Sequence, residues 1–449
     1  MSQQNEKVRV LHFTINKYRL VNQFLEIVIS SLGILLVIFL DNPNTSLPIL
    51  SYYIIGISLY LIFKVRKNSY LVLLFGIITY INVSLVLGDL LQIGQVLLKS
   101  SLLWQQSVRS SEYLILGGKG LVLLLSVLNL ILNITFVERH IDKENNKIVK
   151  KNNPLIFYFG LLIMIIFLLT GYTSPVGSTY ESNTRTLYEY CLLLFIVVWY
   201  YSGNSKYKEW LLILFGIVYI LQALYRGDRS SAFPMITLLV LIKNIKITIP
   251  RIFSLSILGI IFSNLVSTYR QGFSLDGLTS AYFDTFGLSA LLSDTVSQSY
   301  YTAISIMKVG DTLPDTWKYF FNFVAGIFLG GNFPNADVGA MSNNILFNRG
   351  GGLYFSWFYF WFGMLGIVFG ALSLGIIIRA FFNKDNNIPK IFQLALVTMS
   401  FRWYLYTPFV FFRSVLFIFT SLFLVSKLVD KYVSVGKKRK NFDTAALTS

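Results

Sequence analysis

Charge, cysteine and histidine are all scarce in this sequence. Charged residues make up 13% of the 449 residues, whereas about 25% is usual in soluble domains. The single cysteine, Cys191, excludes a disulfide framework, a cysteine-based zinc site and an iron–sulfur centre. His12 and His140 are the only two histidines. The low content of charge argues against a soluble enzyme.

Apolar residues fill the chain instead, at 55% of its length. They are arranged in runs, and a helix needs about 20 such residues to cross the hydrocarbon core of a bilayer. The runs lie at 21–40, 47–63, 69–87, 113–136, 155–171, 187–203, 210–225, 232–242, 252–268, 354–378, 391–405 and 413–427. We therefore expect an all-α, polytopic integral membrane protein with about 12 transmembrane helices.

The basic residues indicate how these helices are oriented. An even number of crossings places both termini on one side, and cytoplasmic loops carry an excess of Lys and Arg. With both termini inside, 26 of the 38 Lys and Arg residues fall in inner segments. The distribution of the net charge of +17 thus agrees with the positive-inside rule and does not indicate a nucleic acid partner. Residues 1–19 are polar and basic, so we expect the first apolar run, not a signal peptide, to direct insertion.

The runs divide the sequence into five parts. These are a cytoplasmic N-terminal segment (1–19), helices 1–9 with short loops (20–268), a large extracytoplasmic loop between helices 9 and 10 (269–353), helices 10–12 (354–427) and a basic cytoplasmic tail (428–449). A loop of that length is usually functional or folds as a small cap. Its apolar stretch 319–329 is too short to cross and predicts a re-entrant or surface helix. Segment 88–112 predicts an interfacial helix.

Several arginines are expected at depth in the membrane. The hairpin 210–243 crosses twice in few residues, so its turn, with Arg226, Asp228 and Arg229, is expected below the outer surface. By helical rise, Arg402 and Arg413 lie about 18 and 21 Å from the inner face. Each buried charge costs at least about 2.5–3.5 kcal/mol. Such residues persist where they line a cavity or meet a counter-charge.

These arginines outnumber the acids nearby. Together with Arg270 they number five, and Asp228 is the acid close to them in sequence. Guanidinium groups bind phosphate oxygens bidentately and keep their proton. The excess of charge predicts an anionic ligand, such as a lipid-linked pyrophosphate that enters from the membrane. In the alternative interpretation, Arg226 and Arg229 bind ordinary lipid phosphates and Arg413 snorkels.

A glycine triplet gives a second candidate anion site. Arg349 precedes Gly350, Gly351 and Gly352, which open the tenth apolar run. Exposed backbone N–H groups at a helix start can face an anion. The alternative, which the sequence favours equally, is that the glycines form a flexible hinge between the large loop and the tenth run. For Lys119, beside glycines in the fourth run, snorkelling is favoured over a ligand role.

The predicted outer side offers acids and tyrosines but no histidine. Both histidines are predicted to be inner, which excludes Ser-His and Cys-His catalysis outside. Tyr269 and Tyr354 could stack on sugar rings, although interfacial belts use the same residue type. The large loop has no Asp-x-Asp pair, so no metal and no cofactor are expected. Its acids are Asp276, Asp284, Asp294, Asp311, Asp315 and Asp337.

The segment from about Gly310 to Gly375 resembles the bacterial oligosaccharide repeat-unit polymerases of the O-antigen and capsule type, the Wzy class. The resemblance is carried by Pro314, Pro334, the glycine triplet, Ser356, Tyr359 and Phe362-Gly363-Met364-Leu365-Gly366. Gly227-Asp228-Arg229-Ser230 is also similar, as is the plan of many spans with one large outer loop. Where related chains often carry Glu and Asn, this one has Trp357 and Trp361.

The resemblance implies a glycosyltransferase of the bacterial plasma membrane that needs no metal. It would transfer a glycan from undecaprenyl pyrophosphate to the next lipid-linked repeat unit at the outer face, with flippase and chain-length regulator proteins as partners. We expect Arg226, Arg229, Arg402 and Arg413 around the pyrophosphate, where they stabilise the leaving group. Arg270 and Arg349 would steer the sugar or the second lipid, helped by Tyr269, Tyr354 and the glycines. Asp228 or an acid of the large loop is the candidate base.

Three other functions compete with this one. Related lipid-linked glycan ligases share the topology but use an outer histidine, which this sequence lacks. A flippase for the same lipid would carry buried charge in two similar halves, whereas the buried arginines here fall in the second half. A non-catalytic membrane partner in glycan assembly would give these arginines no purpose.

Overall fold

A computed structural model of the chain describes residues 2–91, 111–133, 148–172, 185–272, 298–346, 348, 351–383 and 386–447. Within these ranges every regular element is a helix, and the one isolated β-bridge joins Asn152 to Ser202. The predicted all-α class is therefore confirmed. The predicted interfacial helix at 88–112 falls largely outside the described residues.

Ten helices are described in the first 272 residues. They are α1 (Ser2–Phe39), α2 (Pro43–Lys64), α3 (Ser69–Leu85), the π-helix η1 (Val86–Leu90), α5 (Ser111–Ile131), α7 (Pro154–Leu169), α8 (Thr186–Tyr200), α9 (Lys206–Tyr225), α10 (Arg229–Ile242) and α11 (Ile249–Gly272). Several of these helices have a capping side chain at their N-terminus, which accepts a hydrogen bond from a backbone N–H of the first turn. The capping residues are Asn42, Asn68, Asn153 and Asp228.

Shorter helices then precede the last long ones. They are α13 (Gln298–Thr312), α14 (Trp317–Leu329), α15 (Val338–Ile345), α16 (Tyr354–Phe382), α17 (Asn387–Thr398), α18 (Ser400–Leu405), the π-helix η5 (Val410–Ile418) and α19 (Phe419–Leu447). The apolar stretch 319–329 forms α14, a helix too short to cross a bilayer, as predicted.

The described helices make the chain a multi-pass membrane protein. Among the described residues, eight helices are long and apolar enough to span a bilayer, and α7, α8 and α10 are shorter apolar helices. The run predicted at 391–405 is not one helix, because the chain breaks at Met399 between α17 and α18. Pro408 then separates α18 from η5, since proline lacks the N–H that a continuing helix needs. Twelve spans remain a prediction.

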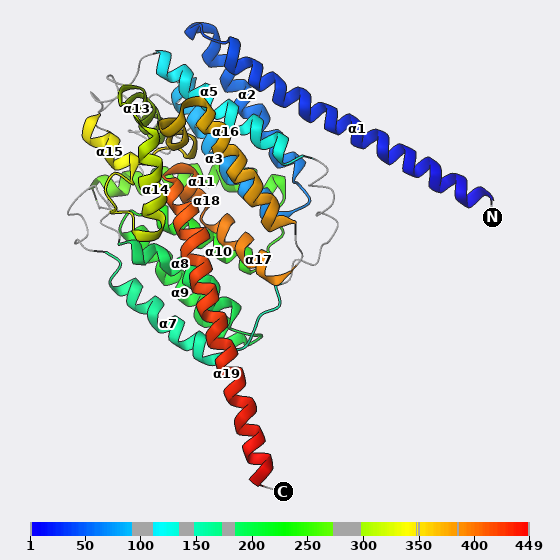
Figure 1. The fold of residues 1–449 in the computed structure, drawn as a ribbon, viewed down its shortest axis with the longest axis vertical. Coiled ribbons are helices and arrows are strands. Elements are labelled where there is room, and N and C mark those ends of the chain that lie inside the picture. The colour runs from blue at the N-terminus through cyan, green and yellow to red at the C-terminus, as the bar shows by residue number, and fades with distance from the viewer. Residues whose placement is uncertain are drawn as a thin grey trace.

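Two groups of helices meet at α17 and α18. In Figure 1, α1, α2, α5 and α16 lie side by side in one group, and α7, α8 and α9 lie in the other. Helix α17 contacts α3, α8, α10 and α16, and α18 contacts α3, α10 and α16. Leu394, Leu396 and Val397 on α17 have no exposed surface. Arg402 on α18 is thus held at the junction of the two groups.

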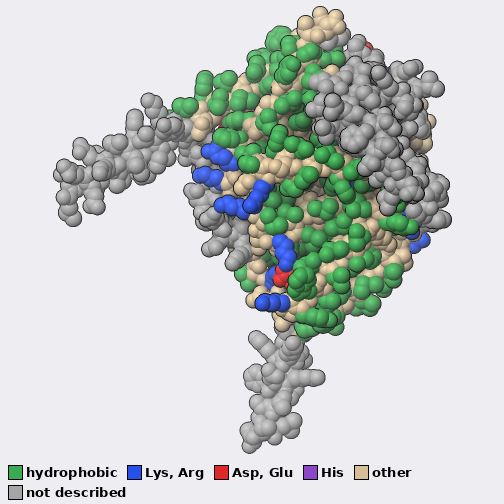
Figure 2. All heavy atoms as spheres, turned by 180° about the vertical axis from the view of Figure 1, so that it is seen from behind, with side chains coloured by type: hydrophobic (Ala, Val, Ile, Leu, Met, Phe, Trp, Pro, Cys, Tyr) green, Lys and Arg blue, Asp and Glu red, His purple; other side chains and the backbone are tan. Residues whose placement is uncertain are grey.

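The segments predicted to face the cytoplasm come together at one end of the molecule. Lys151 pairs with Asp430 at 2.8 Å, and Lys243 pairs with Glu209 at 3.0 Å. These contacts connect the start of α7, the start of α9, the end of α10 and the middle of α19. On the face in Figure 2, Lys and Arg side chains gather in one area, whereas apolar side chains cover most of the remaining described surface.

Helix α16 is a hairpin, not a single span. Phe362 and Gly363 leave the helical conformation, with φ of −141° and +60°. The chain reverses there, so that the Tyr354 hydroxyl lies 3.3 Å from the Gly370 carbonyl oxygen. A Cβ on Gly366 would overlap the carbonyl group of Phe358. The Phe-Gly-x-x-Gly sequence thus supplies a positive φ at its first glycine and close backbone contact at its second.

A charged pair lies buried where α1, α2 and α5 meet. Glu26 pairs with Lys64, whose Nζ also donates to the carbonyl oxygen of Asn129 at 3.2 Å and to its Oδ1 at 2.9 Å. The two charged side chains are 3% and 1% exposed. A buried charge needs a partner of opposite charge, and this pairing explains an acid inside the first apolar run.

Replacing Lys64 with Met is expected to destabilise the protein by about 3–5 kcal/mol, because it leaves the Glu26 carboxylate buried without its cation. Adding Glu26→Gln should recover most of that loss. Thermal unfolding of purified protein in detergent measures both. A single variant as stable as the wild type would contradict the buried pair.

The hairpin of α16 gives a second test. Gly366→Ala is expected to lower stability by about 1–3 kcal/mol, because the methyl group meets the Phe358 backbone. Gly56→Ala on α2 is the matched control, since a Cβ there meets nothing within 4 Å; this variant should gain up to about 1 kcal/mol from helix propensity. Equal melting temperatures for the two variants would argue against the close contact.

Candidate functional site

The start of α8 contacts two of the predicted arginines directly and approaches a third, Arg226, through Tyr172. Tyr188, Glu189 and Tyr190 are consecutive there, and each contacts a different part of the predicted site. Glu189 pairs with Arg402, and the Tyr190 hydroxyl accepts from Nε of Arg413 at 3.1 Å. The Tyr188 ring lies 4.9 Å, between centroids, from that of Tyr172, which faces the α9–α10 turn.

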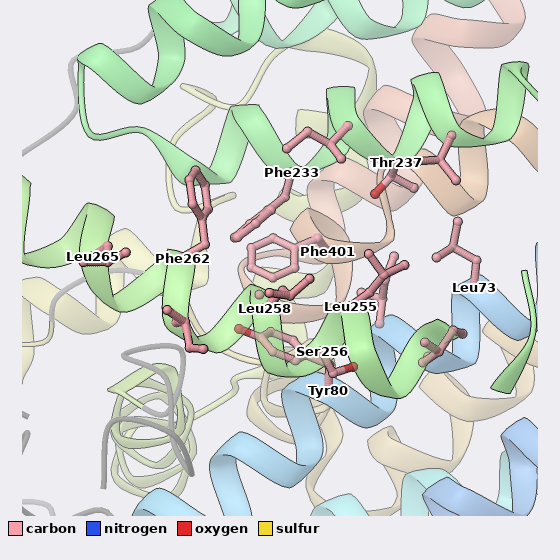
Figure 3. Close-up of a pocket in the computed structure, with 17 residues that line it drawn as sticks. Leu73, Tyr80, Phe233, Thr237, Leu255, Ser256, Leu258, Phe262, Leu265 and Phe401 are labelled. Carbon is pink, nitrogen blue, oxygen red and sulfur yellow. The ribbon is translucent and has the colours of Figure 1, made fainter. Parts of the chain in front are cut away.

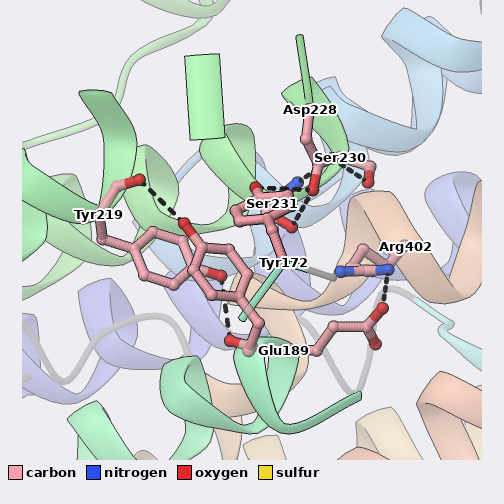
Figure 4. Close-up of polar contacts among 8 residues, drawn as sticks. Tyr172, Glu189, Tyr219, Asp228, Ser230, Ser231 and Arg402 are labelled. Atoms are coloured by element: carbon pink, nitrogen blue, oxygen red, sulfur yellow. Dashed lines mark hydrogen bonds and ion pairs between the residues drawn. The ribbon is translucent and has the colours of Figure 1, made fainter. Parts of the chain in front are cut away.

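Arg402 and Glu189 form an ion pair between α18 and α8. Their side chains are 12% and 17% exposed, and Figure 4 shows the guanidinium and the carboxylate facing each other. Arg402 uses Nη2 in this pair. Its Nε and Nη1 are buried and have no hydrogen-bond partner in the described part of the chain. Buried donors of this kind are normally satisfied, so these two N–H groups suit an acceptor oxygen from a ligand.

The sequence prediction that Asp228 is the acid near these arginines was therefore incomplete. Glu189 is 213 residues from Arg402 in the chain, so proximity in sequence could not reveal the pair. One signal was available, because Glu189 lies inside the apolar run 187–203, and an acid in such a run requires a partner.

The α9–α10 turn holds its polar groups tightly. Gly227 has φ of +68°, which glycine adopts without strain. Asp228 caps α10 and is 4% exposed. Its carboxylate accepts from the Ser230 hydroxyl at 2.6 Å, the Ser231 hydroxyl at 2.8 Å and the Tyr172 hydroxyl at 3.3 Å. Because three hydroxyl groups already donate to this carboxylate, it suits the fixing of the turn better than proton abstraction.

Aromatic rings connect this turn to α8. The guanidinium carbon of Arg226 lies 5.0 Å from the centroid of the Tyr172 ring, a cation–π distance. Tyr188 and Tyr219 stack with centroids 4.3 Å apart, and each hydroxyl donates to the other residue's carbonyl oxygen at 3.2 Å. The tyrosines therefore fix Arg226 relative to the Glu189 turn, and sequence reasoning missed Tyr172, Tyr188 and Tyr219.

Arg229 points to α11, away from the α8 turn. Its Nη1 donates to the carbonyl oxygen of Ser263 at 3.2 Å and also contacts the Ser263 hydroxyl. Near the end of α11, the partly buried Tyr269 donates from its hydroxyl to the Tyr225 carbonyl oxygen at 3.2 Å. These bonds hold α11 against the α9–α10 turn. Arg270 lies in the last turn of α11, but its side chain lies outside what the structure describes.

Arg413 connects η5 to the end of α14. Its Nη1 donates to the carbonyl oxygens of Gly326 and Ile327 at 2.9 and 2.8 Å. Those carbonyls belong to the last turn of α14, where the Gly326 oxygen also accepts from the N–H of the C-cap residue Gly330 at 3.0 Å. A cation also suits this end of a helix dipole. Arg413 thus caps α14.

The glycine segment before α16 has a packing role. Gly351 and Gly352 have φ of +85° and +112°. A Cβ on Gly352 would come within 2.5 Å of Ile306, and one on Gly351 within 3.1 Å of the Tyr406 ring. Glycine is thus required by both backbone angle and space. Arg349 and Gly350 lie outside the described residues.

Tyr354 does not line an open site. It has no exposed surface, and its hydroxyl lies 3.3 Å from the Gly370 carbonyl oxygen and 3.1 Å from the Ser373 hydroxyl. It joins the two arms of the α16 hairpin, so the predicted contact with a sugar ring is wrong. Trp357 and Trp361 are also buried, and both pack against Phe323 in an aromatic core, with ring planes inclined at 61° and 47°.

A separate polar cavity of about 350 Å³ is lined by Asp41, Lys119, Asp311, Tyr359 and neighbouring residues. Lys119 reaches the exposed Asp41 at 2.7 Å, as a snorkelling side chain does. Asp311 accepts from the Tyr359 hydroxyl at 3.0 Å. Burial raises the pKa of Asp311, and this hydrogen bond opposes the rise.

The other acids of the large loop are not brought to the arginines. Asp315 is exposed and pairs with Lys318 at 2.6 Å, and Asp337 caps α15 through the Ala340 N–H at 2.9 Å. The predicted acids at 276, 284 and 294 lie outside the described residues. Within the described ranges, no group of three or more His, Cys, Asp and Glu side chains could hold a metal ion.

The geometry therefore offers a group of arginines that can bind an anion. Arg402 presents two unused N–H donors, and Arg226 and Arg413 lie on either side of the same α8 turn. Such a site binds and stabilises negative charge on oxygen. A scan of protein-family models, a search of curated proteins and a search of solved structures each find no match to this chain.

Proposed function

We propose that this chain is a membrane glycosyltransferase that polymerises undecaprenyl-pyrophosphate-linked oligosaccharide repeat units into O-antigen or capsular polysaccharide at the outer face of the bacterial plasma membrane. The observation that carries the proposal is Arg402, a nearly buried arginine whose Nε and Nη1 have no hydrogen-bond partner among the described residues. A purely structural ion pair would need only the Nη2 contact with Glu189. The Nε and Nη1 groups lie on opposite edges of the guanidinium, and each can donate to an oxygen of an anionic ligand.

Charge balance also favours an anionic substrate. Arg226, Arg229, Arg402 and Arg413 exceed the two acids Glu189 and Asp228 by two positive charges. A lipid pyrophosphate that still carries its sugar has about two ionised oxygens, which this excess would neutralise. Hydrogen bonds from Arg229 and Arg413 to neutral oxygens do not remove their charge, so both residues still attract the anion.

In the proposed reaction, the bond between the anomeric carbon of the donor sugar and the pyrophosphate oxygen breaks. The hydroxyl oxygen of the acceptor sugar forms the new bond to that carbon and releases its proton. Negative charge develops on the pyrophosphate, where Arg402 and Arg226 stabilise it. Asp228 already accepts hydrogen bonds from Ser230, Ser231 and Tyr172. We therefore assign it to holding the turn, and a group other than Asp228 accepts the proton of the acceptor hydroxyl.

The decisive variant is Arg402→Lys. Lysine keeps the charge opposite Glu189, so stability should stay within about 1 kcal/mol of the wild type. The loss of the Nε and Nη1 donors should lower polymerisation by about a hundredfold or more. The readout is the glycan ladder in cells that lack the native copy, normalised to the amount of protein in the membrane.

Arg379→Lys is the matched control, because Arg379 donates to the Ile131 carbonyl oxygen at 3.1 Å, away from the α8 turn; this variant should keep the ladder. A normal ladder from Arg402→Lys at normal protein level would make the arginine purely structural. Repeat units that accumulate on the inner leaflet would identify a flippase instead.

A further inference from the structure

An apolar groove runs between α10 and α11 and is lined on a third side by α3. It has a volume of about 490 Å³. Figure 3 shows Phe233, Phe262 and Phe401 directed toward one another in one part of it, with Leu73 and Thr237 further along. Leu255 and Leu258 on its rim are 49% and 61% exposed. Because α3 and α11 are candidate membrane spans, the groove opens sideways into hydrocarbon.

The groove leads to an arginine. Phe233, Thr237 and Val240 line it and follow Arg229 on the same face of α10, at intervals of three or four residues. From Val240 to Arg229 the helix rises about 16 Å. On the opposite wall, Phe262 lines the groove and precedes Ser263, which accepts the hydrogen bond from Arg229. Arg229 is not a lining residue, but it lies one helical turn before Phe233 and so beside this end of the groove.

The same end of the groove adjoins the Arg402 site. The Phe233 ring lies 5.3 Å from that of Phe401 and 6.2 Å from that of Phe262, between centroids. Phe401 immediately precedes Arg402 on α18. Arg229 and Arg402 do not line the groove themselves, but each lies within one helical turn of a lining residue, Phe233 and Phe401 respectively. A ligand whose apolar chain occupies the groove would therefore carry an anionic head close to them.

We propose that this groove holds the hydrocarbon chain of the lipid pyrophosphate donor, with the pyrophosphate at Arg229 and Arg402. The inference rests on the proposed function and adds to it how the donor is held and oriented. An apolar groove with arginines beside one end is complementary to a lipid that has a single hydrocarbon chain and an anionic head. A diacyl phospholipid would leave its second chain outside.

Gly259→Phe tests the groove directly. A Cβ at this position meets only the Tyr80 ring, at 3.7 Å or more, so the backbone accepts a side chain that then fills the groove. Gly56→Phe on α2 is the matched control, since nothing lies within 4 Å of a Cβ there. Equilibrium binding to the full chain in nanodiscs would use undecaprenyl diphosphate and farnesyl diphosphate, which share a head and differ in chain length.

The wild type should bind undecaprenyl diphosphate about tenfold or more tightly than farnesyl diphosphate, because the longer chain makes van der Waals contacts along more of the groove. Gly259→Phe should lose that preference and should also weaken the farnesyl compound, because Gly259 lies only about 6 Å along α11 from Ser263. Gly56→Phe should behave as the wild type. Arg402→Lys should weaken both lipids, because it changes the site for the head.

The possible failures are distinct. If Gly259→Phe keeps the preference for the long chain while Arg402→Lys weakens both lipids, the groove inference is overturned and the proposed function stands. If the wild type binds neither diphosphate, the proposed function fails with it. If phosphatidylglycerol displaces the long-chain lipid at matched concentration, the groove holds ordinary bilayer lipid and the inference is overturned.

Discussion

The ion pair between Arg402 and Glu189 is the constraint around which the rest of this structure is arranged. A guanidinium at depth in a membrane protein is costly unless an acid or a ligand compensates it. Glu189 supplies one half of that compensation, and α18 and α8 must lie side by side for the pair to form. The neighbours of Glu189 in the same helical turn then contact Arg413 and the tyrosines beside Arg226. One turn of α8 therefore positions three arginines from three separate segments.

Breaks in helices bring these charges together. If the run from α17 to η5 were one continuous helix, Arg402 would lie in its middle. The chain could not then change direction on either side of this residue. The chain instead interrupts the run at Met399 and again at Pro408, so that short α18 lies between two groups of helices. The reversal of α16 at Gly363 similarly produces a short arm that packs beside the long one. Irregular backbone inside a membrane protein is tolerated only where protein or a cavity covers it, and here the aromatic core around Trp357 and Trp361 supplies that cover.

The sequence predicts the elements better than their partners. Apolar runs locate nearly every described helix, because helix length and bilayer thickness are linked through a fixed rise per residue. The positions of Arg226, Asp228 and Arg402 could also be inferred, since charge inside an apolar run is visible without a structure. Their partners could not, because Glu189 and Tyr172 lie far from them in the chain and tertiary packing alone brings them close. Tyr354 shows the opposite error, since an aromatic residue at the start of a run has the same pattern whether it packs in a hairpin or faces a sugar.

A single arrangement accounts for both the polar and the apolar features of the site. The face of α10 that begins with Arg229 continues as the apolar wall of the groove, and the aromatic contact between Phe233 and Phe401 brings the end of that wall to Arg402. Electrostatics alone would attract any anion, and the groove alone would admit any lipid chain. Their junction selects a molecule that is anionic at one end and apolar along the rest, and it holds the boundary between the two parts at a fixed depth. In the reaction that we propose, the bond that breaks lies just beyond the pyrophosphate of the lipid-linked sugar, so fixing that depth would also fix where an acceptor hydroxyl must arrive.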